Sequence, residues 1–208
     1  MSRAKEIISL AKRVRALAQT GLVYNPGDYD RERYEELTQI SDKLQAAATG
    51  LGEEEIASSY RPATEYVTPK VDIRAVVFNE RDEILLVRER ADGCWSLPGG
   101  WSDVGFSPKE VARKEVLEET GLEVRPSRLL ALLDMSKHDH PVIPFYVYKC
   151  FILCEPQGGA FTEAFDILGK GFFPVDNLPP LSLERVLPEQ IRLMRHLRAH
   201  PEEGPVLD

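Results

Sequence analysis

The chain has few cysteines and no long run of apolar residues, and each absence excludes a class of protein. Three cysteines among 208 residues make a poor disulfide framework, which indicates a reducing compartment. The opening segment, MSRAKEIISLAKRVRALAQTG, scatters charges among its apolar residues and so lacks the apolar core of a signal peptide. No later segment is long and apolar enough to predict a membrane span. We therefore expect a cytoplasmic protein that has no membrane partner.

Basic residues are fewer than acidic ones. The chain has 26 Lys and Arg against 34 Asp and Glu, so its formal net charge at pH 7 is -8. An acidic surface repels phosphate polymers unless basic residues are locally concentrated, and the sequence shows no obvious concentration of that kind. We therefore expect a small-molecule ligand and no nucleic-acid partner.

Nitrogen and sulfur ligands for a metal ion are sparse. Cys150 and Cys154 flank three apolar residues in an expected strand, which holds their Cα atoms roughly 13 Å apart, too far for a disulfide. His196 and His200 stand at helical i, i+4 spacing near the carboxyl end. We interpret the cysteines as buried thiols and these histidines as solvated helix positions rather than zinc ligands.

Apolar residues at helical spacing predict two helices before residue 51. The first is expected to end at Gly21, and the second to begin with Asp28 or Asp30 as its cap and to end at Gly50. Two short helices in an antiparallel hairpin bury too little apolar surface to be stable alone. We therefore expect an N-terminal helical domain over residues 1–65 that mediates homodimerisation or forms a lid over the substrate.

Strand and helix patterns interleave after residue 65, which indicates an α/β domain over residues 66–208. Two strands, 71–78 and 83–88, are joined by a polar turn and so predict a hairpin. Further strands are expected over 128–136 and 144–156, and helices over 107–120 and 187–200. The pattern favours a mixed sheet covered by helices.

The expected helix over 107–120 has three glutamates on one face, Glu115, Glu118 and Glu119. Like charges at this spacing disfavour a helix by a few tenths of a kcal/mol per pair, so a neutralising partner is expected. Mg²⁺ prefers carboxylate oxygens and is usually completed by water and substrate phosphates, and Mn²⁺ is a possible substitute. A solvated acidic face is the alternative, but the preceding Gly99-Gly100 permits the close backbone approach that a metal–phosphate centre needs.

This stretch resembles the Nudix box, G-x5-E-x7-R-E-U-x-E-E-x-G-U, in which U is aliphatic. The spacing holds without a gap, and the matching residues are Gly100, Glu115, Val116, Glu118, Glu119, Gly121 and Leu122. Two positions depart, because Phe106 stands in place of the first Glu and Lys114 in place of Arg. In the family these two side chains can support the helix through a charged contact, so we interpret the two departures as coupled.

The resemblance implies the Nudix α/β/α sandwich with a mixed sheet, joined here to a small N-terminal α-helical hairpin domain. It also implies Mg²⁺-dependent hydrolysis of a nucleoside diphosphate linked to another moiety, of the ADP-ribose or CDP-choline type, to a nucleoside monophosphate and a phosphorylated moiety. Glu115, Glu118 and Glu119 would hold the metal, and Glu118 or Glu119 would orient or deprotonate the water. An additional carboxylate is expected from Glu163 or Asp166 in a later loop.

Substrate contacts are expected from the glycine pair and from basic residues, namely Gly99, Gly100, Lys137, His138, Arg74 and Arg88. A solvated loop and a balance of surface charge are the alternatives for the basic residues. Substrate specificity is expected to depend on loops 134–144 and 156–170. Neither loop contains a recognisable ligand-binding motif, so the sequence does not identify the substrate.

Other functions remain open. A Nudix-like module that binds or senses a nucleotide without hydrolysing it would explain the two departures from the box. An interaction protein with a vestigial box, or a hydrolase of nucleoside triphosphates, is also compatible with the sequence.

Overall fold

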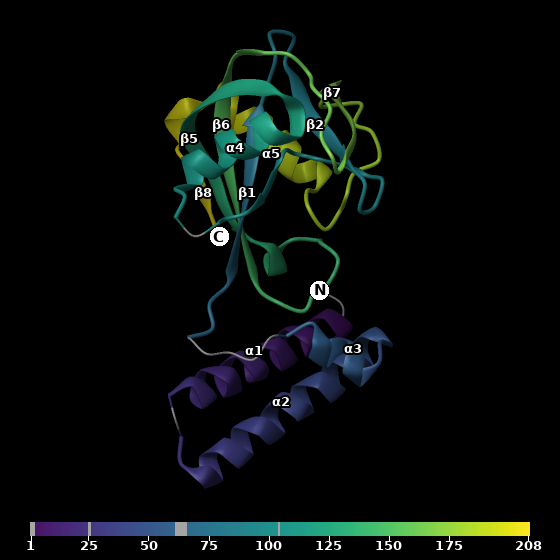
Figure 1. The fold of residues 1–208 in the computed structure, drawn as a ribbon, viewed down its shortest axis with the longest axis vertical. Coiled ribbons are helices and arrows are strands. Elements are labelled where there is room, and N and C mark those ends of the chain that lie inside the picture. The colour runs from purple at the N-terminus through teal and green to yellow at the C-terminus, as the bar shows by residue number, and fades with distance from the viewer. Residues whose placement is uncertain (1–2, 25, 61–65, 104) are drawn as a thin grey trace. The chain divides into compact units, whose positions relative to one another are not determined.

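The structure is a computed structural model that describes residues 3–24, 26–60, 66–103 and 105–208 (Figure 1). It divides into two compact units, one of Met1–Pro69 with Val142–Tyr146 and the other of Lys70–Pro141 with Val147–Asp208. The domain boundary expected near residue 65 lies outside the described residues. Among the described helices, none combines the length and apolar character needed to cross a bilayer.

The N-terminal unit contains α1 (Arg3–Val23), α2 (Asp28–Thr49) and α3 (Glu53–Ser58). The two expected helices are confirmed, and Gly50 ends α2 in the left-handed conformation with φ 77°. Gly21, however, lies inside α1 rather than at its end, and a Cβ there would stand 2.4 Å from the Tyr34 ring. Its small size permits the two helices to approach, which a pattern within one helix does not reveal.

The structure also differs from the sequence-based expectations at the start of α2 and in the presence of a third helix. Asp28 is the first residue of α2 and Gly27 precedes it without a side-chain cap, so neither Asp28 nor Asp30 is the N-cap. The short α3 was not predicted.

The contact between α1 and α2 is largely polar. Arg15 pairs with Asp42, and the Ser41 hydroxyl donates to the Ala11 carbonyl oxygen at 2.8 Å, with all three polar side chains buried. Ile8, Ala11 and Ala18 of α1 are buried, whereas other apolar residues of the two helices face outward, and Leu10 is 63% exposed. These outward apolar stripes consist of Ile7, Leu10, Leu17, Leu37, Ile40 and Leu44.

Residues 142–146 belong to the helical unit because α1 and the segment after α3 hold them. Lys12 Nζ donates to the Phe145 carbonyl oxygen at 2.7 Å, and Tyr146 Oη donates to the Ser9 carbonyl oxygen at 3.0 Å. Tyr60 Oη donates to the carbonyl oxygen of Pro144. A segment from the middle of the chain thus completes the N-terminal unit.

The second unit contains two described sheets. One has the order β4-β1-β6-β5-β8 and the other β3-β2-β7. The strands are β1 (Lys70–Val77), β2 (Glu83–Glu89), β3 (Trp95–Ser96), β4 (Gly99–Trp101), β5 (Leu122–Asp134), β6 (Val147–Gly159), β7 (Ile167–Pro174) and β8 (Val206–Leu207). β1 pairs in parallel with β6 and antiparallel with β4, so the expected mixed sheet is confirmed.

Helices α4 (Pro108–Thr120) and α5 (Pro188–Ala199) cover opposite faces of the larger sheet (Figure 1). Successive residues of a strand point to opposite faces. Ala75 accordingly packs in one buried cluster with Val116 of α4, whereas Val76 packs in the other with Met194 of α5. The expected α/β/α layering of helix, sheet and helix is confirmed.

The hairpin expected from residues 71–88 is wrong. The strands β1 and β2 lie in different sheets, and their described link is a single bridge between Phe78 and Ile84. The connecting turn does form, because Asn79 Oδ1 accepts from the backbone N–H groups of Arg81 and Glu83. Local residues were sufficient to predict the turn. The strands themselves pair with segments far away in the sequence, β1 with β6 and β2 with β7.

The cysteines agree with the interpretation of buried thiols in part. All three are free, and Cys150 and Cys154 are buried in β6. Burial raises the pKa of Cys150 to about 11 and that of Cys154 to about 12. Both side chains therefore remain protonated and unreactive near neutral pH. Cys94 is only half-buried.

His140 is a buried structural residue that links a loop to α5. Its Nδ1 lies 2.6 Å from the Leu183 carbonyl oxygen, which can only accept, so Nδ1 carries the proton. Its Nε2 lies 2.9 Å from the Gln190 amide nitrogen and accepts from it. Burial lowers the pKa of His140 to about 4.

We predict that acid destabilises the protein through His140. The unfolded state gains a proton on this side chain below its ordinary pKa of 6.5, whereas the folded state resists until about pH 4. The free energy of unfolding should therefore fall by up to about 3 kcal/mol as the pH decreases across that window. Urea titrations from pH 7 to pH 4 measure this loss. It should shrink in His140→Asn, which keeps a donor for Leu183, and an unchanged pH slope in that variant would contradict the assignment.

Candidate active site

The acidic helix α4 begins and ends where its sequence predicts. Ser107 Oγ accepts from the Glu110 N–H at 3.3 Å while the Glu110 carboxylate accepts from the Ser107 N–H at 2.7 Å, which forms a capping box. Pro108 occupies the first turn, and Gly121 ends the helix with φ 82°. Val111 and Val116 are buried against the sheet, so the face with the glutamates lies at the margin of the core.

The three glutamates occupy different environments. The Glu118 side chain is 58% exposed, whereas that of Glu115 is only 16% exposed. Burial raises the pKa of Glu119 to about 8 against the opposing charge of Arg74, and repulsion from Glu115 and Glu89 adds to the shift. Burial also raises the pKa of Glu115. Without a bound cation, burial therefore keeps Glu119 mostly protonated near neutral pH.

Gly99 fixes Glu119 in place. Its N–H donates to Glu119 Oε2 at 3.1 Å, while its backbone pairs with β1 opposite Arg74. The φ angle of Gly99 is 146°, and a Cβ at this position would stand 2.0 Å from the Ile73 carbonyl oxygen. Only glycine fits here. Gly99 and Gly100 are the first two residues of strand β4, and at Gly99 the backbone makes a close approach to β1.

Lys114 neutralises part of the acidic face. Its Nζ lies 3.3 Å from Glu115 Oε1, 3.2 Å from Glu118 Oε2 and 3.7 Å from Asp103 Oδ2. Asp103 stands three residues before Phe106, whose exposed side chain occupies the position where a glutamate was expected. Asp103 thus provides a carboxylate near the lysine that position 106 does not.

Arg74 supports the site from within the core. Its guanidinium donates to Asp72, to Ser96 Oγ at 3.2 Å and to the Leu97 carbonyl oxygen at 3.1 Å. Lys149 Nζ lies 2.7 Å from Asp72 Oδ2, which also accepts from Arg74 Nε. Although burial acts in the opposite direction, these two cations lower the pKa of Asp72. Arg74 is buried, so its donors are used by protein groups rather than presented to solvent.

Two carboxylates and a lysine join the site from other elements. The charge of Glu89 at the end of β2 acts on Glu119, and the charge of Asp166 acts on Glu89. Lys170 Nζ donates to the Glu119 carbonyl oxygen at 3.0 Å and to the Thr162 carbonyl oxygen. Sequence reasoning missed Glu89 and Lys170, because neither stands in a recognisable local pattern. It did select Asp166, which approaches this charge cluster.

The structure describes no contact between the acidic face of α4 and the other residues that the sequence selected for the site. Arg88 Nε donates to the Gly93 carbonyl oxygen at 2.7 Å. Lys137 is exposed in η1 (Met135–Lys137), and His138 Nε2 lies 2.8 Å from Asp208 Oδ2. Glu163 is exposed in the loop before β7. No described contact joins these four residues to the glutamates, so their roles remain predictions.

Comparisons with known proteins cover both units. Residues 5–59 match the UDP-X-like, N-terminal oligomerisation domain, and residues 68–197 match the NUDIX domain. The chain is 43% identical over 198 residues to YjhB of Bacillus subtilis (strain 168), covering 95% of each chain. The name of that protein includes a provisional assignment as an ADP-ribose pyrophosphatase.

Two crystal structures resemble the fold. One, of a UDP-X diphosphatase, is 34% identical and covers 100% of both chains with a TM-score of 0.64. The other, of an ADP-ribose pyrophosphatase from Streptococcus suis 89-1591, is 45% identical and covers 68% of this chain and 100% of its own, with a TM-score of 0.60.

We predict that Gly99→Ala destabilises the protein by at least about 2 kcal/mol, because the new Cβ would collide with backbone in a strained conformation. Gly100→Ala is the matched control. Its Cβ would lie 3.5 Å from the Glu115 carboxyl group, an ordinary contact, so its stability should change by less than about 1 kcal/mol. Urea unfolding measures both changes, and equal stabilities for the two variants would contradict the role given to Gly99.

Proposed function

The chain belongs to the Nudix family of hydrolases, and from this premise we propose that it hydrolyses a nucleoside diphosphate linked to another moiety. The products would be a nucleoside monophosphate and the phosphorylated moiety. The observation that supports this most directly is the acidic face of α4, held by Gly99 against β1. Relatives named as ADP-ribose pyrophosphatase and UDP-X diphosphatase support a nucleoside diphosphate derivative as the substrate class, within which we propose the ADP-ribose or CDP-choline type.

The donor set fits a hard divalent cation. Glu115, Glu118 and Glu119 provide carboxylate oxygens, which Mg²⁺ prefers, with Mn²⁺ as a substitute. Burial raises the pKa values of Glu115 and Glu119, so their ionised forms would be favoured by a cation bound beside them. A cation bound here would screen the charge of the diphosphate and lower the pKa of a bound water.

The chain's own residues position and orient the reacting groups. Gly99 fixes the carboxylate of Glu119, and Lys170 holds the last turn of α4 through the Glu119 carbonyl oxygen. Glu118 is exposed and available to orient or accept a proton from water. We leave the base open between Glu118 and Glu119, and we propose Asp166 as the additional carboxylate.

Direct substrate contacts remain proposals for the backbone of Gly99 and Gly100 and for Arg88, Lys137 and His138. We omit Arg74 from that set, because it is buried and bonded to Asp72. We propose that it instead places a positive charge behind Glu119. The cytoplasmic location also remains a proposal, based on the cysteine content.

We propose a homodimer formed through the N-terminal helices. The match to an oligomerisation domain over residues 5–59 supports it. So do the outward-facing apolar side chains, because a monomer would leave them in water.

We predict that Glu119→Gln lowers the rate of hydrolysis by at least about 100-fold, since it removes a charge from the acidic face. The rates should be measured with Mg²⁺ over ADP-ribose, CDP-choline, nucleotide sugars and nucleoside triphosphates. Glu123→Gln, an exposed position in β5, is the matched control and should retain the wild-type rate.

Equal rates for wild type and Glu119→Gln would exclude the proposed site. Ligand binding without turnover by the wild type would favour a nucleotide-sensing module. A preference for triphosphates would change the substrate class and leave the acidic site in place.

We also predict that the full-length protein is a dimer at micromolar concentration in solution sizing with light scattering. The double variant Leu10→Glu with Leu17→Glu should become monomeric, because it places charges on the outward apolar stripe of α1. Gln39→Glu adds the same charge at another exposed position of α2 and should stay dimeric. A monomeric wild type would refute the proposal.

A further inference from the structure

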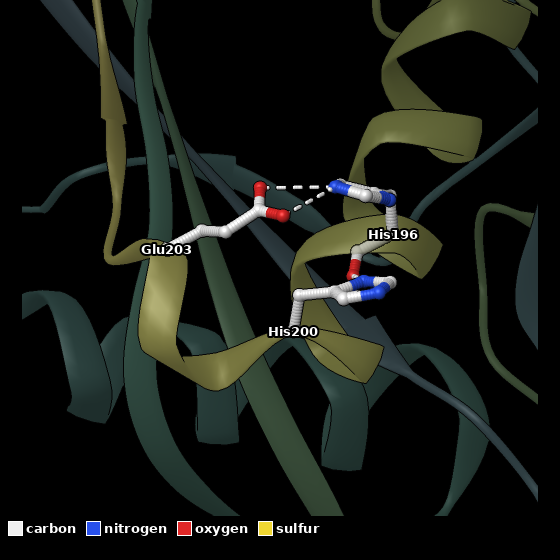
Figure 2. Close-up of side chains that lie close together, drawn as sticks. All are labelled: His196, His200 and Glu203. Carbon is white, nitrogen blue, oxygen red and sulfur yellow. Dashed lines mark hydrogen bonds and ion pairs between the residues drawn. The ribbon is translucent and has the colours of Figure 1, made fainter.

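The end of α5 and the turn after it bring three metal-ligating side chains together (Figure 2). His196 lies in the last turn of the helix, His200 follows its final residue, and Glu203 ends η2 (Pro201–Glu203). One ligand atom from each residue lies within 4.8 Å of the others, and all three side chains are exposed. From the sequence we interpreted the two histidines as solvated positions rather than zinc ligands, because Glu203 joins them only through the turn.

The distances suit a shared ion. His196 Nε2 lies 3.0 and 2.9 Å from the two oxygens of Glu203, and Figure 2 shows this carboxylate directed at the His196 ring. The rings of His196 and His200 are stacked, with their centroids 4.2 Å apart. Around a tetrahedral Zn²⁺, ligand atoms about 2.0–2.2 Å from the metal lie about 3.4 Å from one another. Because the Glu203 oxygens accept, His196 Nε2 carries a proton here, so ligation would require loss of that proton and rotation of the two rings out of their stacked arrangement.

His200 already has the tautomer of a metal ligand. Its Nδ1 lies 2.9 Å from the His196 carbonyl oxygen, which can only accept, so Nδ1 carries the proton and Nε2 keeps its lone pair. Histidines that bind metals usually donate their other N–H to a carbonyl or carboxylate in this way. The cluster also stands at the carboxyl end of α5, where the helix dipole favours a cation.

The cluster differs from the acidic face of α4 in place and in chemistry. It lies at the end of α5, on the opposite side of the larger sheet from α4. Two imidazoles and one carboxylate suit Zn²⁺ and similar transition metals, whereas three carboxylates suit Mg²⁺.

We propose that His196, His200 and Glu203 bind a transition-metal ion of the Zn²⁺ type, with water completing its coordination. The ion would fasten η2 to α5. Glu203 is followed by β8, which pairs with β5 at Ala131 and Leu132. The final residue, Asp208, accepts from the Asp134 N–H at 2.9 Å. Metal binding would thereby stabilise the attachment of the carboxyl-terminal segment to the sheet.

Calorimetric titration of Zn²⁺ into untagged full-length protein tests the proposal. Saturating Mg²⁺ is present throughout, so that oxygen-ligand sites are occupied equally in every sample. Wild type should bind Zn²⁺ at least tenfold more tightly than the His196→Gln, His200→Gln double variant or Glu203→Gln. Glu123→Gln, a control at an exposed carboxylate of β5, should bind as wild type does.

Thermal unfolding gives a second readout. One equivalent of Zn²⁺ should raise the Tm of wild type and of Glu123→Gln, and leave that of the double variant unchanged. The same Zn²⁺ affinity in wild type and the double variant would overturn the site, as would full displacement of the ion by Mg²⁺. An unchanged affinity in Glu203→Gln would overturn the three-ligand arrangement.

Discussion

The hydrogen bond from the Gly99 N–H to the Glu119 carboxylate is the contact on which the acidic site depends. It joins the start of β4 to the end of α4, and it forms because glycine alone fits beside the Ile73 carbonyl oxygen. The positive charge of Arg74 acts on the Glu119 carboxyl group, and Arg74 is itself held by its hydrogen bond to Asp72. The carboxyl groups of α4 are therefore supported by a buried set of charges on the central strands.

The Nudix chemistry and the departures from its box are compatible in this arrangement. Lys114 lies within ion-pair distance of Glu115, Glu118 and Asp103, so a positive charge is retained where the family pattern has arginine. Lysine lacks the planar fork of arginine, which makes its contacts less directional. The three carboxylates nevertheless keep the spacing along α4 that a shared cation requires.

The helical unit buries several polar and charged side chains and leaves several large apolar ones exposed. Arg15, Asp42 and Ser41 occupy the contact between α1 and α2, whereas leucines and isoleucines face outward. Buried polar groups specify one packing of the two helices when their partners are present. The outward apolar stripes leave the unit incomplete as a monomer, which is the physical basis for the proposed dimer.

The sequence by itself determined the features whose partners lie within one helical turn. These include the capping box at Ser107, the end of α4 at Gly121 and the common face of its glutamates, because helix geometry relates residues three and four apart. Tertiary structure decided the rest. Gly99 meets Glu119 across twenty residues of chain, and Glu203 reaches His196 only through a turn. Strand partners, buried charges and converging ligands depend on which distant segments pack together, and no local spacing records that.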